Sequence, residues 1–162
     1  MNTQTTAGLN CPNDKRHLLV AVDESDNARR TVAYVADLFG GLADACVTLL
    51  SIIQEPSEDF FPTAVEGAAW LREREATMRA ALSAYRELLS RGGFAADRVA
   101  SRVVVRACPS IAGAILEERA KLGCRIVVVG RRGVSRNEEF IFGSTSSKIL
   151  HEAKDCAVMV VE

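Results

Sequence analysis

The chain has 162 residues and a formal net charge of −1, and its composition is 48% hydrophobic, 25% charged and 6% aromatic. This length fits one domain with a substantial core. The near-zero charge provides no field that would attract nucleic acid or an anionic membrane, and few aromatic residues are present for base stacking. We therefore expect an ordinary soluble globular domain with no nucleic-acid partner and no membrane partner.

The N-terminal residues differ in composition from the rest of the chain. Residues 1–14 are polar and lack the apolar segment of a signal peptide. No apolar run reaches the ~20 residues that a bilayer-spanning helix needs. We expect a flexible tail over 1–14, a single domain over 15–162 and a cytoplasmic location.

The cysteines are odd in number and form no Cys-x-x-Cys pair. They are Cys11, Cys46, Cys108, Cys124 and Cys156. This pattern predicts neither a zinc site nor a disulfide framework. We expect Cys46, Cys124 and Cys156, which begin apolar runs, to be small buried thiols in a reducing compartment.

Five short apolar runs alternate with helical patterns along the chain. The apolar runs span 18–22, 47–53, 99–105, 126–129 and 157–161, and the helices between them span about 27–39, 64–90, 110–123 and 144–152. This alternation predicts a parallel sheet with helices on both faces, a three-layer α/β/α fold whose ligand lies at the carboxyl ends of the strands. Ser101 and Arg102 interrupt the third run, which predicts either a position nearer the sheet edge or a strand covered on one side only.

Polar residues follow the first strand directly. Asp23 stands at the expected ligand-binding edge, where a carboxylate can accept hydrogen bonds from ribose hydroxyls or help hold Mg²⁺. The alternative is that Asp23 or Ser25 only caps the helix that follows. Position alone leaves both interpretations open.

Glycines surround the end of the fourth strand. The run ends in Gly130-Arg131-Arg132-Gly133, and nine residues later Gly143-Ser144-Thr145 begins the last helix. Glycine allows close approach of a ligand, and a helix N-terminus offers N–H groups and a positive dipole end, so we expect a phosphate-binding site. Neither a Walker A motif nor a Rossmann Gly-x-Gly-x-x-Gly is present, which excludes the standard kinase-like, GTPase-like and dehydrogenase interpretations.

The glycine spacing resembles the nucleotide-binding signature of the universal stress protein family. The same likeness covers Ala-Val-Asp-Glu-Ser at 21–25, Ile-Val-Val-Val-Gly at 126–130 and Ala-Val-Met-Val-Val at 157–161, and it extends over about 16–162. The resemblance implies a five-stranded parallel sheet of order 3-2-1-4-5, a Rossmann-like fold of the adenine nucleotide alpha hydrolase type.

The resemblance also implies an adenine-nucleotide site. Asp23 would bond the ribose, the backbone near Ile52 would read the adenine edge, and the glycines with Ser144 would hold phosphates and ribose. The nucleotide-binding residues expected together are Ala21, Val22, Asp23, Ser25, Ile52, Val129, Gly130, Arg131, Arg132, Gly133, Gly143, Ser144 and Thr145. Mg²⁺ would arrive with the ATP phosphates, without protein ligands of its own.

Three further expectations concern individual side chains. Arg131 and Arg132 either clamp phosphate oxygens, or they point to solvent or pair with Glu138 and Glu139. Trp70 is expected in the core or an interface rather than as a ligand platform. The histidines, His17 and His151, are expected at the surface, and no catalytic constellation emerges.

These observations lead to one functional hypothesis and two alternatives. The hypothesis is an ATP-binding universal stress protein that acts as a nucleotide-dependent sensor or regulatory module, with at most slow hydrolysis. The first alternative is a protein–protein interaction module of the same fold that does not use nucleotide, and the second is an ATPase. The resemblance further implies a homodimer, formed through the apolar edge strand Ala157–Val161.

Overall fold

The structure is a computed structural model that describes residues 9–11, 16–132 and 143–162. Its elements are β1 (His17–Ala21), α1 (Asp26–Phe39), β2 (Cys46–Gln54), α2 (Ala64–Arg91), a short 3-10 helix η2 (Ala96–Arg98), β3 (Val99–Arg106), α3 (Ile111–Leu122), β4 (Ile126–Gly130), α4 (Ser144–Glu152) and β5 (Ala157–Val161). The alternation of strands and helices confirms the predicted α/β class.

The strands form one parallel sheet in the order β3-β2-β1-β4-β5. This is the order implied by the resemblance, and β3 occupies an edge, which is one of the two alternatives that its interrupted apolar pattern predicted. β1 is central, where Leu19 pairs with Thr48 on one side and Val127 on the other. Because the chain runs outward from β1 to β3 and then returns to β4, the strand order reverses beside β1, where open α/β sheets bind ligands.

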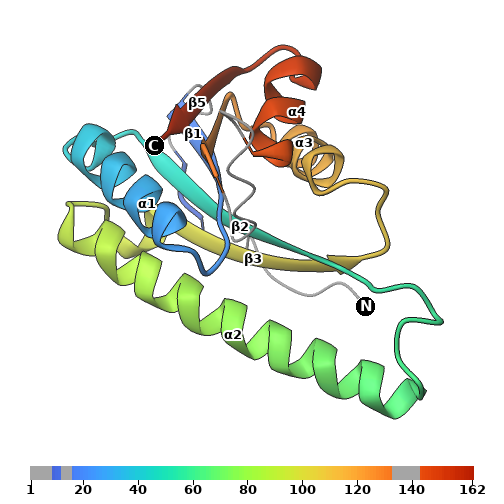
Figure 1. Ribbon diagram of the computed structural model, residues 1–162. Coiled ribbons are helices and arrows are strands. Elements are labelled where there is room, and N and C mark those ends of the chain that lie inside the picture. The colour runs from blue at the N-terminus through green and yellow to red at the C-terminus, as the bar shows by residue number, and fades with distance from the viewer. Residues whose placement is uncertain (1–8, 12–15, 133–142) are drawn as a thin grey trace.

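Helices cover both faces of the sheet, as Figure 1 shows, with α1 and α2 on one face and α3 and α4 on the other. Successive residues of β1 therefore enter different cores, since side chains alternate along a strand. Leu18 and Val20 pack with the α1–α2 side, whereas Leu19 packs with the α3–α4 side. Burial on both faces explains why the strand sequences are almost continuously apolar.

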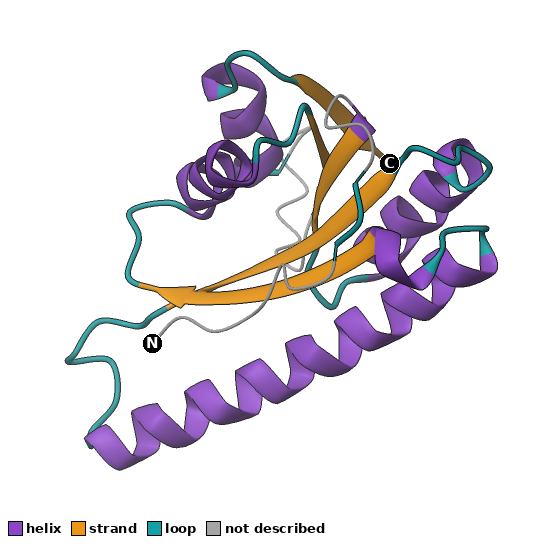
Figure 2. Ribbon diagram, turned by 180° about the vertical axis from the view of Figure 1, so that it is seen from behind, coloured by secondary structure: helices purple, strands orange, loops and turns teal. Residues whose placement is uncertain are grey.

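The helix α2 is much longer than the others. It has 28 residues without a break, about 42 Å at the α-helical rise. Its C-terminal half packs on the sheet through Leu82, Tyr85 and Leu89, while its N-terminal half extends past the strand ends (Figure 2). None of the described helices is long and apolar enough to cross a membrane.

The prediction that His17 lies at the surface is wrong. His17 is buried because β1 begins there, between Cys46 of β2 and the segment that leads into β4. Its Nε2 atom lies 2.8 Å from the hydroxyl of Thr48, and its backbone carbonyl accepts from the N–H of Arg125. His151, in contrast, is exposed, as predicted.

The prediction that Cys46 is a buried thiol is also wrong, because Cys46 is bonded to Cys11. The N–H of Asn10 donates to the carbonyl of Asp97 at 2.7 Å, which places the segment 9–11 beside the start of β3. Cys46 is fully buried next to it, with its Cα 5.7 Å from that of Cys11. Cys124 is a buried thiol, as predicted, while Cys156 is half-buried.

Candidate functional site

A cavity of about 580 Å³ lies at the carboxyl ends of β1, β2 and β4. Its lining residues are Ala21, Val22, Asp23, Ala28, Leu50, Ser51, Ile52, Ile53, Gln54, Trp70, Arg74, Met78, Ile111, Ile115, Val129, Gly130, Arg131, Arg132, Gly143, Ser144, Thr145 and Ser146. Every predicted site residue that the structure describes is among them, except Ser25. Gly133 lies outside the described residues.

The turn after β1 gives different roles to Asp23 and Ser25. The Ser25 hydroxyl accepts from the N–H of Ala28 at 3.1 Å, so Ser25 is the N-cap of α1. The Ser25 N–H and hydroxyl donate to Oδ1 of Asp23 at 2.9 Å and 2.5 Å, which orients the Asp23 carboxylate at the cavity wall. Ser25 therefore has the capping role, and Asp23 has the position expected of a ligand contact.

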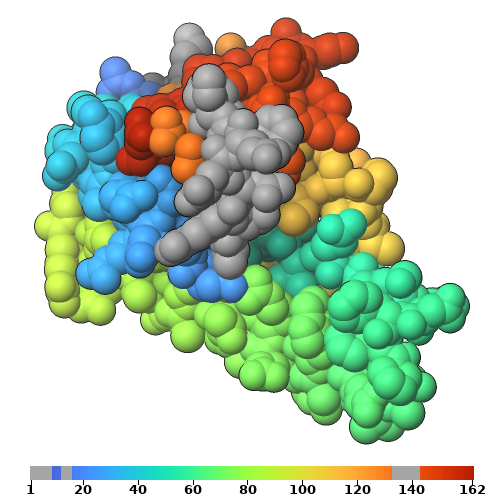
Figure 3. Space-filling model, viewed as in Figure 1, coloured from blue at the N-terminus to red at the C-terminus, as the bar shows by residue number. Residues whose placement is uncertain are grey.

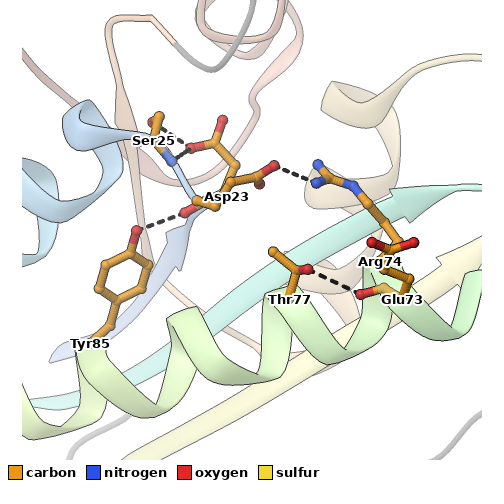
Figure 4. A network of polar contacts seen from close by, with 7 residues as sticks. Asp23, Ser25, Glu73, Arg74, Thr77 and Tyr85 are labelled. Atoms are coloured by element: carbon orange, nitrogen blue, oxygen red, sulfur yellow. Dashed lines mark hydrogen bonds and ion pairs between the residues drawn. The ribbon is translucent and has the colours of Figure 1, made fainter. Parts of the chain in front are cut away.

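Tyr85 of α2 holds the same turn from the other side (Figure 4). Its hydroxyl donates to the backbone carbonyl of Asp23 at 2.8 Å. Burial, together with the negative charges of Asp23 and Glu24, raises the Tyr85 pKa to about 12. The phenol therefore stays protonated and remains a donor to this turn at neutral pH.

Gly130, at the end of β4, is required by packing within the protein. A Cβ at this position would lie 2.0 Å from Oδ1 of Asn27 and 3.2 Å from the hydroxyl of Thr31. Both partners are buried on α1. The glycine therefore lets α1 pack closely against the strand end, which brings the β4 backbone to the cavity.

The start of α4 is held close to the end of β4. The N–H of Gly143 donates to the carbonyl of Arg131 at 2.8 Å, and the Ser146 hydroxyl donates to the same carbonyl at 2.9 Å. A Cβ on Gly143 would lie 3.2 Å from that carbonyl oxygen. These contacts place Ser144 and Thr145 at the cavity.

The N-terminus of α4 differs from those of the other described α-helices. The side chains of Ser25, Thr63 and Ser110 accept hydrogen bonds from the first turns of α1, α2 and α3. At α4 the N-cap is Gly143, which provides no such side chain. Since first-turn N–H groups lack partners within a helix, this uncapped end is suited to bind an anion.

The two arginines after Gly130 behave differently. Arg131 forms an ion pair with Glu162, next to the end of β5. The Nε atom of Arg132 is buried and has no partner among the described residues, although Arg132 lines the cavity. The predicted alternative partners, Glu138 and Glu139, lie outside the described residues. Arg132 thus offers a donor that a phosphate oxygen would satisfy.

The helix α2 contributes a wall of the cavity that was not predicted from the sequence. Trp70, Arg74 and Met78 all line the cavity, and their spacing of four residues places them on one helical face. Trp70 was expected in the core or an interface, and no role in a site was predicted for Arg74 or Met78. The four-residue spacing was the available signal, but it does not reveal what the face contacts.

The cavity contains few groups suited to acid–base or metal chemistry. Its titratable lining residues among those described are Asp23, Arg74, Arg131 and Arg132. Within the described ranges, no group of three or more His, Cys, Asp or Glu side chains could hold a metal ion. The arrangement is therefore suited to binding an anionic ligand with an apolar part.

A family model for universal stress proteins matches residues 15–162. The chain belongs to the universal stress protein family. A search among curated protein sequences finds no match. The family membership therefore rests on the family model and agrees with the fold described above.

Solved structures share the fold of this universal stress protein. The hypothetical protein MJ0577 has a TM-score of 0.77 and 19% identity, with 92% of this chain and 96% of that chain covered. A universal stress protein in complex with cAMP has a TM-score of 0.64, 19% identity and coverage of 91% and 97%. The universal stress protein from Archaeoglobus fulgidus in complex with dAMP has a TM-score of 0.61, 18% identity and coverage of 90% and 96%.

Proposed function

We propose that this universal stress protein binds an adenine nucleotide, ATP in particular, and acts as a nucleotide-dependent sensor or regulatory module in the stress response. The observation that carries the proposal is one cavity lined by the N-terminus of α4, which has no side-chain cap from Gly143, by Arg132, whose Nε has no partner among the described residues, and by Asp23. Binding of cAMP and dAMP by two proteins of the same fold supports an adenine nucleotide as ligand.

Each part of the nucleotide has a matching region of the cavity. The N–H groups that begin α4 and the guanidinium of Arg132 suit phosphates, because both are donors with positive character. Asp23 suits ribose hydroxyls, and the strand-end residues Val22 and Ile52 suit the apolar faces of adenine. Mg²⁺ would be held by the phosphates of ATP.

The same residues favour binding over rapid hydrolysis. No histidine is among the described residues that line the cavity, and His17 begins β1, at the other end of the sheet. Asp23, the carboxylate that the described residues contribute to the lining, already accepts two hydrogen bonds from Ser25. Water activation therefore lacks an evident base, and slow turnover is the expected limit.

The proposal is tested by calorimetric titration with ATP, ADP and AMP in the presence of Mg²⁺. We expect micromolar ATP binding in the wild type and about 10-fold weaker binding in Arg132→Gln, since a charge-assisted hydrogen bond is lost. Arg91→Gln is the matched control, because Arg91 is 78% exposed and pairs only with Glu87 among the described residues. The absence of binding below millimolar concentration for all three nucleotides would contradict the proposal.

We also propose that the protein forms a homodimer through β5. Among the described strands, β5 pairs with β4 alone, so its other edge offers unpaired backbone groups next to apolar side chains. Antiparallel pairing of two such edges about a two-fold axis would cover both. We expect Val160→Lys to lower the mass measured by sedimentation, with thermal unfolding as a check on the fold. A monomeric wild type would refute the dimer.

A further inference from the structure

The two sides of the cavity have different chemistry. Gly130, Arg132 and the start of α4 supply backbone N–H groups and positive charge beside β4. On the other side of β1, α2 packs with β2 and β3 and presents Trp70, Arg74 and Met78. The groups suited to bind phosphate are thus separated by the central strand from a wall of large side chains. We call this wall, formed by Trp70, Arg74 and Met78, the α2 wall.

Arg74 is held at the strand ends. Its guanidinium forms an ion pair with Oε1 of Glu24, in the turn that follows β1. The Arg74 side chain is only 34% exposed, although it lies on a helix whose other arginines mostly face solvent. One edge of the planar guanidinium binds Glu24, and such a plane can stack on an aromatic ring.

Trp70 lies one helical turn before Arg74 on α2. Its ring centroid lies 5.7 Å from that of Phe61, whose ring in turn packs edge-on against Phe60 at 5.0 Å. Phe60 and Phe61 lie in the segment before α2, and this segment and the start of α2 form the protruding end of the molecule (Figure 3). Trp70 is half-buried and lines the cavity with Ile53 and Ile111, so part of its ring remains accessible to a ligand.

We propose that the α2 wall is the base-recognition surface of this site, with Trp70 and Arg74 as residues that contact and select a planar nucleobase. This inference rests on the proposed nucleotide function and adds the groups that distinguish a nucleotide from a bare polyphosphate. Met78, one helical turn after Arg74, supplies an adaptable apolar contact at the cavity. The wall lies on the side of Ile52, where the strand-end backbone is available to the edge of the base.

The first experiment uses the intrinsic fluorescence of Trp70, which is the single tryptophan of the chain. We expect ATP to change this emission with the same dissociation constant that calorimetry gives. Inorganic tripolyphosphate, which has no base, is expected to bind more weakly and to leave the emission unchanged. A change of equal size with both ligands would overturn the assignment of Trp70 to the base.

The second experiment compares variants of the wall. We expect Trp70→Leu and Arg74→Gln each to weaken the binding of ATP and AMP by about 10-fold, since each variant loses a stacking contact. Arg74→Lys keeps the charge but not the plane, so it is also expected to weaken both nucleotides. Tripolyphosphate affinity is expected to stay the same in all three variants.

The matched control is Arg79→Gln, on the same helix, because Arg79 is half-exposed and pairs with Glu75. Thermal unfolding checks that each variant is folded. Unchanged ATP affinity in both Trp70→Leu and Arg74→Gln, with normal ATP binding by the wild type, would overturn the α2 wall and leave the proposed function intact. If no adenine nucleotide binds the wild type, both proposals fail.

Discussion

The β4–α4 side of the cavity and the α2 wall are built in different ways. The first uses backbone groups, and its glycines Gly130 and Gly143 permit close packing of backbone and neighbouring side chains. The second uses the side chains of Trp70, Arg74 and Met78 on a long helix. The difference explains why a sequence pattern identified one side and missed the other, because backbone-built sites depend on local spacing while side-chain walls depend on how a helix packs.

The largest effect on stability is expected at the disulfide, which lies at the end of the sheet opposite the cavity. Reduction of the Cys11–Cys46 disulfide, or Cys11→Ser, is expected to lower the free energy of unfolding by about 2–4 kcal/mol, because the cross-link restricts the unfolded chain. Urea denaturation measures the loss, and Cys156→Ser is the control. The affinities for ATP and for tripolyphosphate are expected to stay unchanged.

A thiol count checks the disulfide itself. The chain has five cysteines, and Cys108, Cys124 and Cys156 are the thiols outside the bond. A titration of the denatured, unreduced protein is therefore expected to find these three thiols. A count of five would contradict the disulfide and remove the reason for the stability loss. A disulfide is also rare in the cytosol, so the expected cytoplasmic location stays a prediction.

The packing role of Gly130 provides the second test. Gly130→Ala is expected to lower the free energy of unfolding by about 2 kcal/mol, because its Cβ would overlap Oδ1 of the buried Asn27. Gly41→Ala is the matched control, since a Cβ there meets no atom within 4 Å. We expect Asn27→Ala to recover part of the loss. Strictly additive losses in the double variant would mean that the two residues do not interact.

The independence of the two sides provides the third test. Arg132→Gln is expected to weaken the binding of tripolyphosphate and of ATP alike. Trp70→Leu is expected to weaken the binding of only those ligands that carry a base. Because the two residues lie on opposite sides of β1 and share no contact among those described, the double variant is expected to lose about 100-fold in ATP affinity, the product of two effects of about 10-fold. A loss of only about 10-fold would mean that both residues serve the same part of the ligand.

The smallest effect is expected at Tyr85, which joins α2 to the turn after β1. Tyr85→Phe removes the hydrogen bond to the Asp23 carbonyl and is expected to lower the free energy of unfolding by about 1 kcal/mol at neutral pH. The Tyr85 pKa is about 12 in the folded protein against 10.0 ordinarily, so the unfolded chain ionises first. The stabilisation from Tyr85 is therefore present below pH 10 and is lost as the pH rises toward 12.

Stability measured against pH checks this expectation. The wild type and Tyr85→Phe are expected to converge between pH 10 and pH 12. Tyr34→Phe is the control, because Tyr34 is 55% exposed. A difference between wild type and Tyr85→Phe that stays constant over this range would show that the phenol does not ionise with a raised pKa.

Much of the fold followed from short-range patterns. Apolar runs and helix-end glycines located the strands and α-helices of the described residues to within a few positions, because a strand buried on both faces must be apolar throughout. The strand after Gly123 and the helix that begins at Ser144 were placed in the same way. The glycine spacing likewise indicated the β4–α4 side of the cavity, since the backbone contacts there involve neighbouring segments.

What the sequence by itself determined was the α/β class, the placement of the elements and the family signature around Gly130 and Gly143. The tertiary structure alone decided that Arg74 faces the strand ends rather than solvent, that Trp70 lines the cavity, that His17 is buried against Thr48 and that Cys11 reaches Cys46. Periodicity reports which residues share a face of one element. Contacts between residues 31 to 50 positions apart arise only when those elements pack together.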